Sequence, residues 1–194
     1  MLDRPTRPPT MRALAKQATR AKVLAAARET ITNCGYEDTT IRDIAKLAGM
    51  STGAVFSSFD SKEELLIAVL EAEHEEEKAF MKDVAFSNND PVQRIGSMLA
   101  ANYSFWQQKL NLLSCRLSLA RSNDAFGEFT DKVDCALTNA ICAVLLEHGV
   151  VEAELKAQVL LAVHLRNLQV QTGFPWHVDP KMPIGQSVNL VLQS

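Results

Sequence analysis

The sequence predicts an all-α protein with a small N-terminal helical domain and a larger C-terminal helical domain. Apolar residues recur at helical spacing through most of the 194 residues, and no segment alternates apolar and polar residues as a half-buried strand does. Capping residues and glycines divide this pattern into separate helices. A chain of this length can also bury a substantial core.

The first helix is expected over residues 16–34. Val23 and Ile31 lie on one face of it, and Gly35 directly after it can end the helix. The residues before it, 1–15, contain prolines and arginines and are expected to form a flexible basic arm.

Positive charge is concentrated at the N-terminal end. Residues 1–28 contain seven lysines and arginines and one aspartate, a net charge of +6, whereas the whole chain carries −3, so residues 29–194 carry −9. A basic end on an acidic body is expected when that end meets nucleic-acid phosphates. The arginines among the N-terminal prolines fit a solubilising tail equally well, whereas Lys16, Arg20 and Lys22 lie on the first helix and favour proximity to phosphate.

A short second helix is expected directly after Thr40. Thr40 can cap it, and Asp43 three residues later can complete a capping box. Ile44 and Ala48 would face inward. Gly49 can then adopt the left-handed conformation that ends a helix.

A third helix is expected almost at once, over residues 52–57. Ser51 can cap it, so the turn is short, and a short turn sets the second helix steeply across the first. The outer residues then project from the domain, as entry into a DNA major groove requires. After Phe59, Ser61 and Glu64 can form a capping box for the next helix.

The order and spacing of these residues resemble the DNA-binding domain of the TetR family of transcriptional regulators. The matching positions are Thr19, Arg20, Leu24, Ala26, Ala27, Gly35, Tyr36, Thr39, Thr40, Ile44, Ala45, Ala48, Gly49, Ser51, Gly53, Phe59, Ser61, Lys62, Glu63 and Leu65. The match covers about the first third of the chain and is more specific than one short pattern. The resemblance implies a helix-turn-helix DNA-binding domain, residues 16–61. It also implies a helical domain, residues 62–194, that is joined through the fourth helix, dimerises and binds a small effector.

Two positions depart from the family pattern. Phe56 stands where the family usually has Tyr, and Ser58 where it usually has His or Tyr. Both usual residues commonly donate hydrogen bonds to phosphate, whereas Phe56 has no donor and Ser58 has a shorter reach. A neutral hydrogen bond contributes about 0.5–1.5 kcal/mol, so each half-site is expected to depend more on other contacts.

The expected DNA contacts follow from this placement. Bases are expected to meet Thr52, Gly53, Ala54 and Ser57, with Arg42 reaching a base edge or a phosphate. Phosphate contacts, which fix register without reading sequence, are assigned to Lys16, Arg20, Thr40, Ser51, Ser58 and Lys62. Phe56 completes the predicted DNA-contacting set.

Six more helices are expected, over residues 62–84, 91–108, 110–121, 124–148, 152–172 and 184–192. Asp90 can cap one of them, with Pro91 at its first position. The segment 174–183 holds three prolines and is expected to be a loop. The acidic run 71–78 is interpreted as a solvated helix face.

The last two helices carry apolar residues beyond a single stripe. These are Leu155, Val159, Leu160, Ala162, Val163, Leu168, Ile184, Val188, Leu190, Val191 and Leu192. An additional apolar face predicts a partner, and the resemblance implies a homodimer built on a four-helix bundle. Two DNA-binding domains related by a two-fold axis would bind a palindromic operator in double-stranded DNA, with half-sites about 34–36 Å apart or a multiple of that spacing.

A small-molecule effector site is expected in the C-terminal domain. Its candidate residues are Met98, Asn102, Tyr103, Trp106, Phe126, His164, Asn167 and Leu168. A mostly apolar cavity with a few inward polar groups is how such sites are built. The same spacing also fits an ordinary helix core, and His164 fits a hydrogen-bonded interior histidine better than a metal ligand.

No cofactor, metal site or enzymatic activity is predicted. The sequence lacks a glycine-rich phosphate loop, a nucleophile elbow and an HExxH motif. The four cysteines, Cys34, Cys115, Cys135 and Cys142, have no CxxC spacing and are expected to be buried thiols. No apolar run approaches the roughly 18 residues of a membrane span, so a cytoplasmic protein without a membrane partner is expected.

These patterns predict a TetR-like repressor that a small-molecule effector releases from its operator. The alternative is a DNA-binding dimer without an effector, regulated by a protein partner or by abundance. A metabolite that raises the unfolding temperature would distinguish the two.

Overall fold

The computed structural model describes residues 10–84, 90–119, 124–171 and 184–193. These ranges contain helices and turns and no strand, which confirms the all-α prediction. The chain divides into two compact units, Met1–Val69 and Leu70–Ser194. The division falls inside helix α4 (Lys62–Val84), which therefore starts in the first unit and ends in the second.

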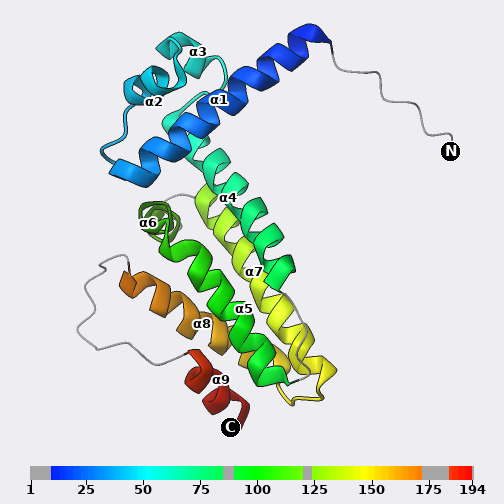
Figure 1. The fold of residues 1–194 in the computed structure, drawn as a ribbon. Coiled ribbons are helices and arrows are strands. Elements are labelled where there is room, and N and C mark those ends of the chain that lie inside the picture. Colours follow the sequence, from blue (N-terminus) through cyan, green and yellow to red (C-terminus); the bar gives the residue numbers. More distant parts are fainter. Residues whose placement is uncertain (1–9, 85–89, 120–123, 172–183, 194) are drawn as a thin grey trace, which may run out of the picture. The chain divides into compact units, whose positions relative to one another are not determined.

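The first unit contains α1 (Met11–Cys34), α2 (Ile41–Ala48), α3 (Thr52–Phe56) and the start of α4 (Figure 1). α2 packs against both α1 and α3. The buried apolar side chains of this unit are Val23, Ala26, Ala27, Ile31, Ile44, Ala45, Val55, Phe59, Leu65, Leu66 and Val69.

Helix α1 begins earlier than the sequence predicted. The Thr10 side chain accepts a hydrogen bond from the Ala13 backbone N–H at 3.2 Å, so this threonine starts the helix at Met11. The prediction of a flexible arm is therefore wrong for residues 11–15, and residues 1–9 lie outside the described ranges. Gly35 ends the helix with a φ of 84°, as predicted.

The second unit contains the rest of α4 with α5 (Pro91–Gln107), α6 (Leu110–Leu119), α7 (Asp124–Glu147), α8 (Ala153–Gln171) and α9 (Ile184–Gln193). α7 packs along α8, and α9 packs against α5 and α8 (Figure 1). Its main apolar core comprises Ile95, Met98, Leu99, Ile141, Val144, Leu145, Ala153, Ala157, Leu160 and Val188. Asp90 caps α5 with Pro91 at the helix start, which confirms that prediction.

Two sequence interpretations about burial were wrong in part. The acidic run on α4 is not simply a solvated face, because Glu73 and Glu77 are buried. Both find polar partners on segments distant in sequence, which the local charge pattern could not reveal. Among the cysteines, Cys115 is buried and Cys142 half-buried, whereas Cys34 and Cys135 are exposed. The predicted loop at 174–183 lies outside the described residues.

Candidate DNA interface and effector cavity

The start of α2 is fixed by a reciprocal cap. The Thr40 hydroxyl accepts a hydrogen bond from the Asp43 backbone N–H at 3.2 Å, and the Thr40 N–H donates to the Asp43 carboxylate at 3.2 Å. The capping box is thus confirmed. The Thr40 hydroxyl also donates to that carboxylate and, as the largest cause, holds the pKa of Asp43 below its usual value. In the structure this hydroxyl forms its hydrogen bonds within the cap, whereas the sequence analysis predicted that it contacts a phosphate.

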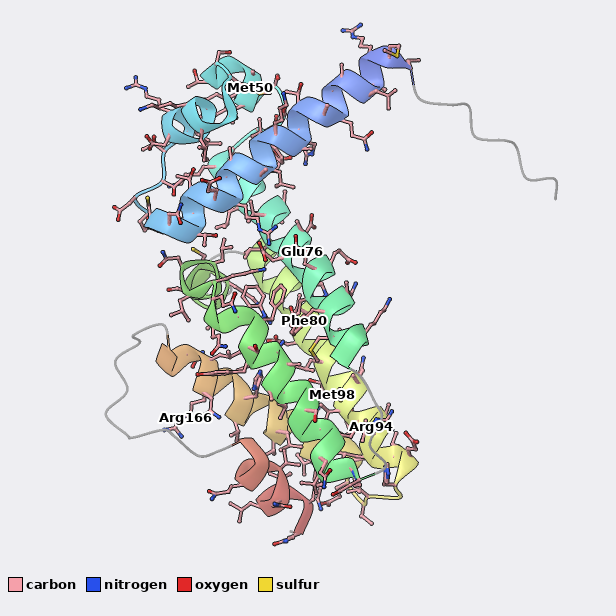
Figure 2. All side chains as sticks on the ribbon, in the orientation of Figure 1. Met50, Glu76, Phe80, Arg94, Met98 and Arg166 are labelled. Carbon is pink, nitrogen blue, oxygen red and sulfur yellow. The ribbon has the colours of Figure 1, made fainter. Side chains whose placement is uncertain are left out.

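The turn between α2 and α3 is as short as predicted. Gly49 adopts the left-handed conformation with φ 65° and ψ 37°, and the Met50 N–H donates to the Ala45 carbonyl at 2.9 Å. Ser51 then caps α3 by accepting from the Ala54 N–H at 3.2 Å. Figure 2 labels Met50 in this turn. The turn places two consecutive capped helices only three residues apart.

Helix α3 is anchored on one side and open on the other. Val55 is fully buried, whereas Thr52, Gly53 and Ser57 are exposed. Phe56 is also exposed, with 51% of its surface accessible. Three of the four residues of α3 and its end that were predicted to meet bases are therefore exposed, and the fourth, Ala54, is half-buried.

The Gly53 position is open in the protein itself. A Cβ atom built there would meet only the Ser51 Oγ, at 3.8 Å, which is ordinary van der Waals contact. Neither folding nor backbone conformation therefore demands glycine at this position. A close approach by another molecule would supply a reason for it.

The hydroxyl groups of Ser57 and Ser58 both form hydrogen bonds with the backbone. Both hydroxyls donate to the Ala54 carbonyl, at 2.7 Å and 3.3 Å respectively. Ser58 is half-buried as well, so it is poorly placed to replace the longer donor that the family usually carries. Ser51 keeps its hydroxyl proton available, because its cap uses the oxygen only as an acceptor.

Arg20 fastens the end of α3 to α1. Its guanidinium donates to the Ser58 carbonyl, lies 3.8 Å from the Phe59 ring centroid, and approaches the Glu64 carboxylate at 3.7 Å. A cation over an aromatic face is an attractive contact. The sequence predicted a phosphate ligand at Arg20 and did not predict this positioning role.

Lys62 makes a similar contact at the start of α4. Its ammonium lies 4.1 Å from the Tyr36 ring centroid and donates to the Glu37 carbonyl at 3.5 Å. Lys16 and Arg42, by contrast, have exposed side chains on α1 and α2. The cations assigned to phosphate thus divide into two that hold the unit together and two that project from it.

The second unit contains a cavity of about 500 Å³ between α4, α5 and α7. Its lining residues are His74, Glu75, Glu77, Lys78, Ala79, Met81, Lys82, Met98, Val133, Ala136, Leu137 and Ala140. A volume of this size suits a small organic ligand. Of the predicted effector residues only Met98, labelled on α5 in Figure 2, belongs to this lining.

The other predicted effector residues have different positions. Trp106 and Leu168 are buried, Tyr103 and Asn167 are half-buried, and the Phe126 side chain lies outside the described residues. None of them is among the lining residues of this cavity. The sequence did not predict this cavity, because it depends on how α4 packs against α5 and α7.

Asn102 and His164 form a buried chain of hydrogen bonds that reaches the cavity wall. The Asn102 amide nitrogen donates to a Glu77 carboxylate oxygen, and the Asn102 carbonyl oxygen lies 2.6 Å from His164 Nε2. Because the amide nitrogen faces the carboxylate, Nε2 must carry the proton that the Asn102 oxygen accepts. Sequence reasoning missed Glu77, whose only signal was a histidine three residues earlier in an acidic run.

Burial lowers the pKa of His164 to about 4, and the nearby positive charge of Arg116 acts in the same direction. The negative charge of Glu77 opposes this shift but is the smallest of the three causes. His164 is therefore a neutral imidazole at neutral pH. This agrees with the prediction of a hydrogen-bonded interior histidine.

Two buried ion pairs complete the polar interior of this unit. Arg116 donates to Asp134, and Lys109 donates to Glu73. In the described ranges no group of three His, Cys, Asp or Glu side chains gathers to hold a metal ion. The helices described there also include none that is long and apolar enough to cross a membrane.

The first unit has the geometry of a helix-turn-helix DNA-binding domain: two capped helices, a glycine turn, and a second helix whose outer side is exposed. Residues 23–69 match the family model described as bacterial regulatory proteins, tetR family. This part of the chain is therefore similar to the DNA-binding domain of the TetR family of transcriptional regulators.

Two named relatives match part of the chain. The chain is 37% identical over 82 residues to the HTH-type transcriptional regulator TtgR of Pseudomonas putida, which is 42% of this chain and 38% of that protein. It is 35% identical over 82 residues to the probable regulator ArpR of Pseudomonas putida, again over 38% of that protein. The matching segment thus spans well under half the length of these relatives.

Solved structures extend the likeness to the whole fold. A transcriptional regulator from Rhodococcus sp. Rha1 superposes with a TM-score of 0.74 at 21% identity, over 90% of this chain and 94% of that one. A TetR transcription regulator from Haloarcula marismortui gives a TM-score of 0.68 at 23% identity, over 91% and 94%. At these identities the likeness establishes the arrangement of helices and not the ligand.

Proposed function

We propose that this protein is a homodimeric repressor that binds a palindromic operator and leaves it when a small molecule occupies the second unit. The observation that carries the proposal is the outer side of α3, where Thr52, Gly53 and Ser57 are exposed beside the buried anchor Val55. Small polar side chains on a rigid, exposed helix suit direct contact with base edges in a major groove.

The phosphate contacts in this proposal come first from cations that the fold leaves exposed. Lys16 and Arg42 project from the first unit, and the Ser51 hydroxyl keeps a proton to donate. Lys62 can add a contact at the start of α4, where helix N–H groups also favour an anion. Arg20 serves mainly to hold α3 in place for these contacts.

The dimer in this proposal is supported by an exposed apolar stripe on α8. Leu155 and Val159, with 55% and 41% of their surface accessible, share a helix face with exposed Ala162. Leu190 on α9 is exposed as well. Apolar groups gathered at helical spacing favour burial against a second copy.

The release step in this proposal runs through α4. This helix lines the cavity with its second half and belongs to the DNA-binding unit with its first half. An effector that binds one position of α4 better than another shifts the balance between them, typically by about 1–3 kcal/mol of coupling free energy. In this proposal, one position of α4 corresponds to the DNA-bound repressor and the other to the released protein.

Selection from random duplex DNA tests this proposal. The full chain should enrich an inverted repeat, and Thr52→Ala should change the preferred bases within each half-site. Lys62→Ala should weaken all sequences alike and flatten the salt dependence by up to about one phosphate contact. Recovery of no common sequence, or a changed preference in Lys62→Ala alone, would contradict the assigned roles.

A further inference from the structure

Glu77 is a buried carboxylate in the wall of the cavity. Only 7% of its side-chain surface is accessible, yet it is one of the residues that line the cavity. Removing a carboxylate from water costs several kcal/mol, on the order of the whole stability of a domain, unless charges or donors compensate it. The partners of Glu77 therefore show how far its charge is compensated within the protein.

Its partners are an amide and an imidazole. The Asn102 amide nitrogen donates to one Glu77 oxygen, and His74 Nδ1 lies 3.5 Å from the other. In the described parts of the chain, no lysine or arginine forms a salt bridge with Glu77. A carboxylate offers about four acceptor positions, so Glu77 can accept further donors.

The buried cations of this unit and the lining residue Lys78 already have carboxylate partners, whereas the lining residue Lys82 is exposed to solvent. Lys109 pairs with Glu73, Arg116 with Asp134, and Lys78 with Glu75. Lys109 also lies 3.6 Å from a Glu76 carboxylate oxygen, so these three cations face four carboxylates. Within the described ranges, the ion pair of Glu77 is with His74, which is charged only when protonated, so no permanent cation of this chain is paired with Glu77.

The remaining wall of the cavity is mostly apolar. Met81, Met98, Val133 and Leu137 supply its larger apolar side chains, and three alanines complete the surface. The side chains of Glu75, Lys78 and Lys82 are exposed and so belong to the solvated side of the cavity. A ligand entering here meets a largely apolar surface with two buried polar side chains, Glu77 and His74, of which Glu77 is the acidic one.

We propose that the cavity binds an apolar molecule that carries one basic amine, with its ammonium group donating to Glu77. Such a pair is a charge-assisted hydrogen bond to a carboxylate that is itself buried, where it is stronger than at an exposed carboxylate. A ligand carboxylate would instead meet the charge of Glu77 and be repelled. The inference rests on the proposed function, since it names the chemical class of the effector.

The hydrogen-bond chain behind Glu77 supports this role. Asn102 holds one carboxylate oxygen and is itself held by His164, so the carboxylate has a fixed orientation. His164 is neutral and does not neutralise Glu77. A fixed acceptor needs no reorganisation when a cation arrives, which favours binding.

Three matched probes test the inference: 4-phenylbutylamine, 4-phenylbutan-1-ol and 4-phenylbutanoate. Their affinities for the full chain are measured by calorimetry at neutral pH without DNA. The amine should bind about tenfold more tightly than the alcohol, and the carboxylate most weakly. Equal affinities, a preference for the carboxylate, or no binding of the amine at millimolar concentration would overturn the inference.

Glu77→Gln should remove the preference, so that the amine and the alcohol bind alike. Glutamine keeps an oxygen for the Asn102 donor and has nearly the same shape, while the exposed Glu71→Gln on the same helix should behave as wild type. Retention of the amine preference in Glu77→Gln would overturn the proposal. The three wild-type affinities decide the question even if that variant does not fold.

Location is tested by Ala136→Phe, which adds a ring at an exposed lining position on α7 and should weaken all three probes. Undiminished binding in that variant would place the probes elsewhere and overturn the inference. Operator binding is measured on the same samples. Wild-type protein that binds its operator and shows no amine preference refutes this inference alone, whereas failure to bind any DNA refutes the proposed function.

Discussion

The two units place their polar side chains in opposite ways. Among the described residues of the first unit, only Thr39 is a buried polar side chain. The second unit buries Glu73, His74, Glu77, Asn102, Arg116 and His164. The first unit keeps its polar side chains outside, where they cap helices and can meet a macromolecule. The second unit buries six of them, and two of these, His74 and Glu77, line the cavity.

This difference predicts in which unit the substitution of a charged residue lowers stability most. An exposed ion pair contributes about 0–1 kcal/mol because water and salt screen it. Removing one partner of a buried pair leaves an uncompensated charge and costs about 3–5 kcal/mol. The stability of the second unit should thus depend on its charges far more than that of the first.

The largest effect is expected for Lys109→Met. Glu73 has no accessible side-chain surface, and Lys109 supplies its cation. Because the carboxylate would remain buried, the free energy of unfolding should fall by about 3 kcal/mol, measured by urea denaturation. Lys78→Met, which breaks the exposed pair with Glu75, is the matched control and should cost under about 1 kcal/mol. Equal losses in the two variants would remove the contrast between buried and exposed charge.

The next effect concerns pH. The pKa of His164 is about 4 in the folded protein, below the ordinary value of 6.5, so the unfolded chain binds the extra proton more readily. Stability from this group is complete above pH 6.5 and is lost as pH falls from 6.5 to 4, by about 3 kcal/mol in all. His164→Gln keeps a donor for Asn102 and does not titrate. Its free energy of unfolding should vary less over that window, and an unchanged slope would contradict the burial of a neutral imidazole.

The sequence predicted the first unit well because local signals determine it. Thr40 with Asp43, the left-handed Gly49 and the cap at Ser51 each act within a few residues, and all three are found in the structure. The start of α1 was predicted at residue 16 and lies at Met11, because the cap at Thr10 was overlooked in a segment that follows several prolines. Local chemistry therefore suffices for a domain built from capped helices.

The second unit was predicted only in outline. Its helices follow from apolar periodicity, but the cavity depends on how α4 packs against α5 and α7. The sequence predicted a solvated charge at Glu77. Its burial accompanies a contact with Asn102, 25 residues away, which the local sequence does not indicate. Long-range pairing of this kind leaves no local signal.

The proposed function depends above all on contact between the outer side of α3 and DNA, and Gly53→Ala tests that contact most directly. The added methyl has room in the free protein, so stability should stay the same or rise by about 0.5–1 kcal/mol. Gly96→Ala in α5, where the built Cβ meets nothing within 4 Å, is the matched control. Affinity of the full chain for its selected duplex should fall about tenfold in Gly53→Ala, because the methyl stands between backbone and groove, and stay unchanged in Gly96→Ala. Wild-type affinity in Gly53→Ala would contradict the claim.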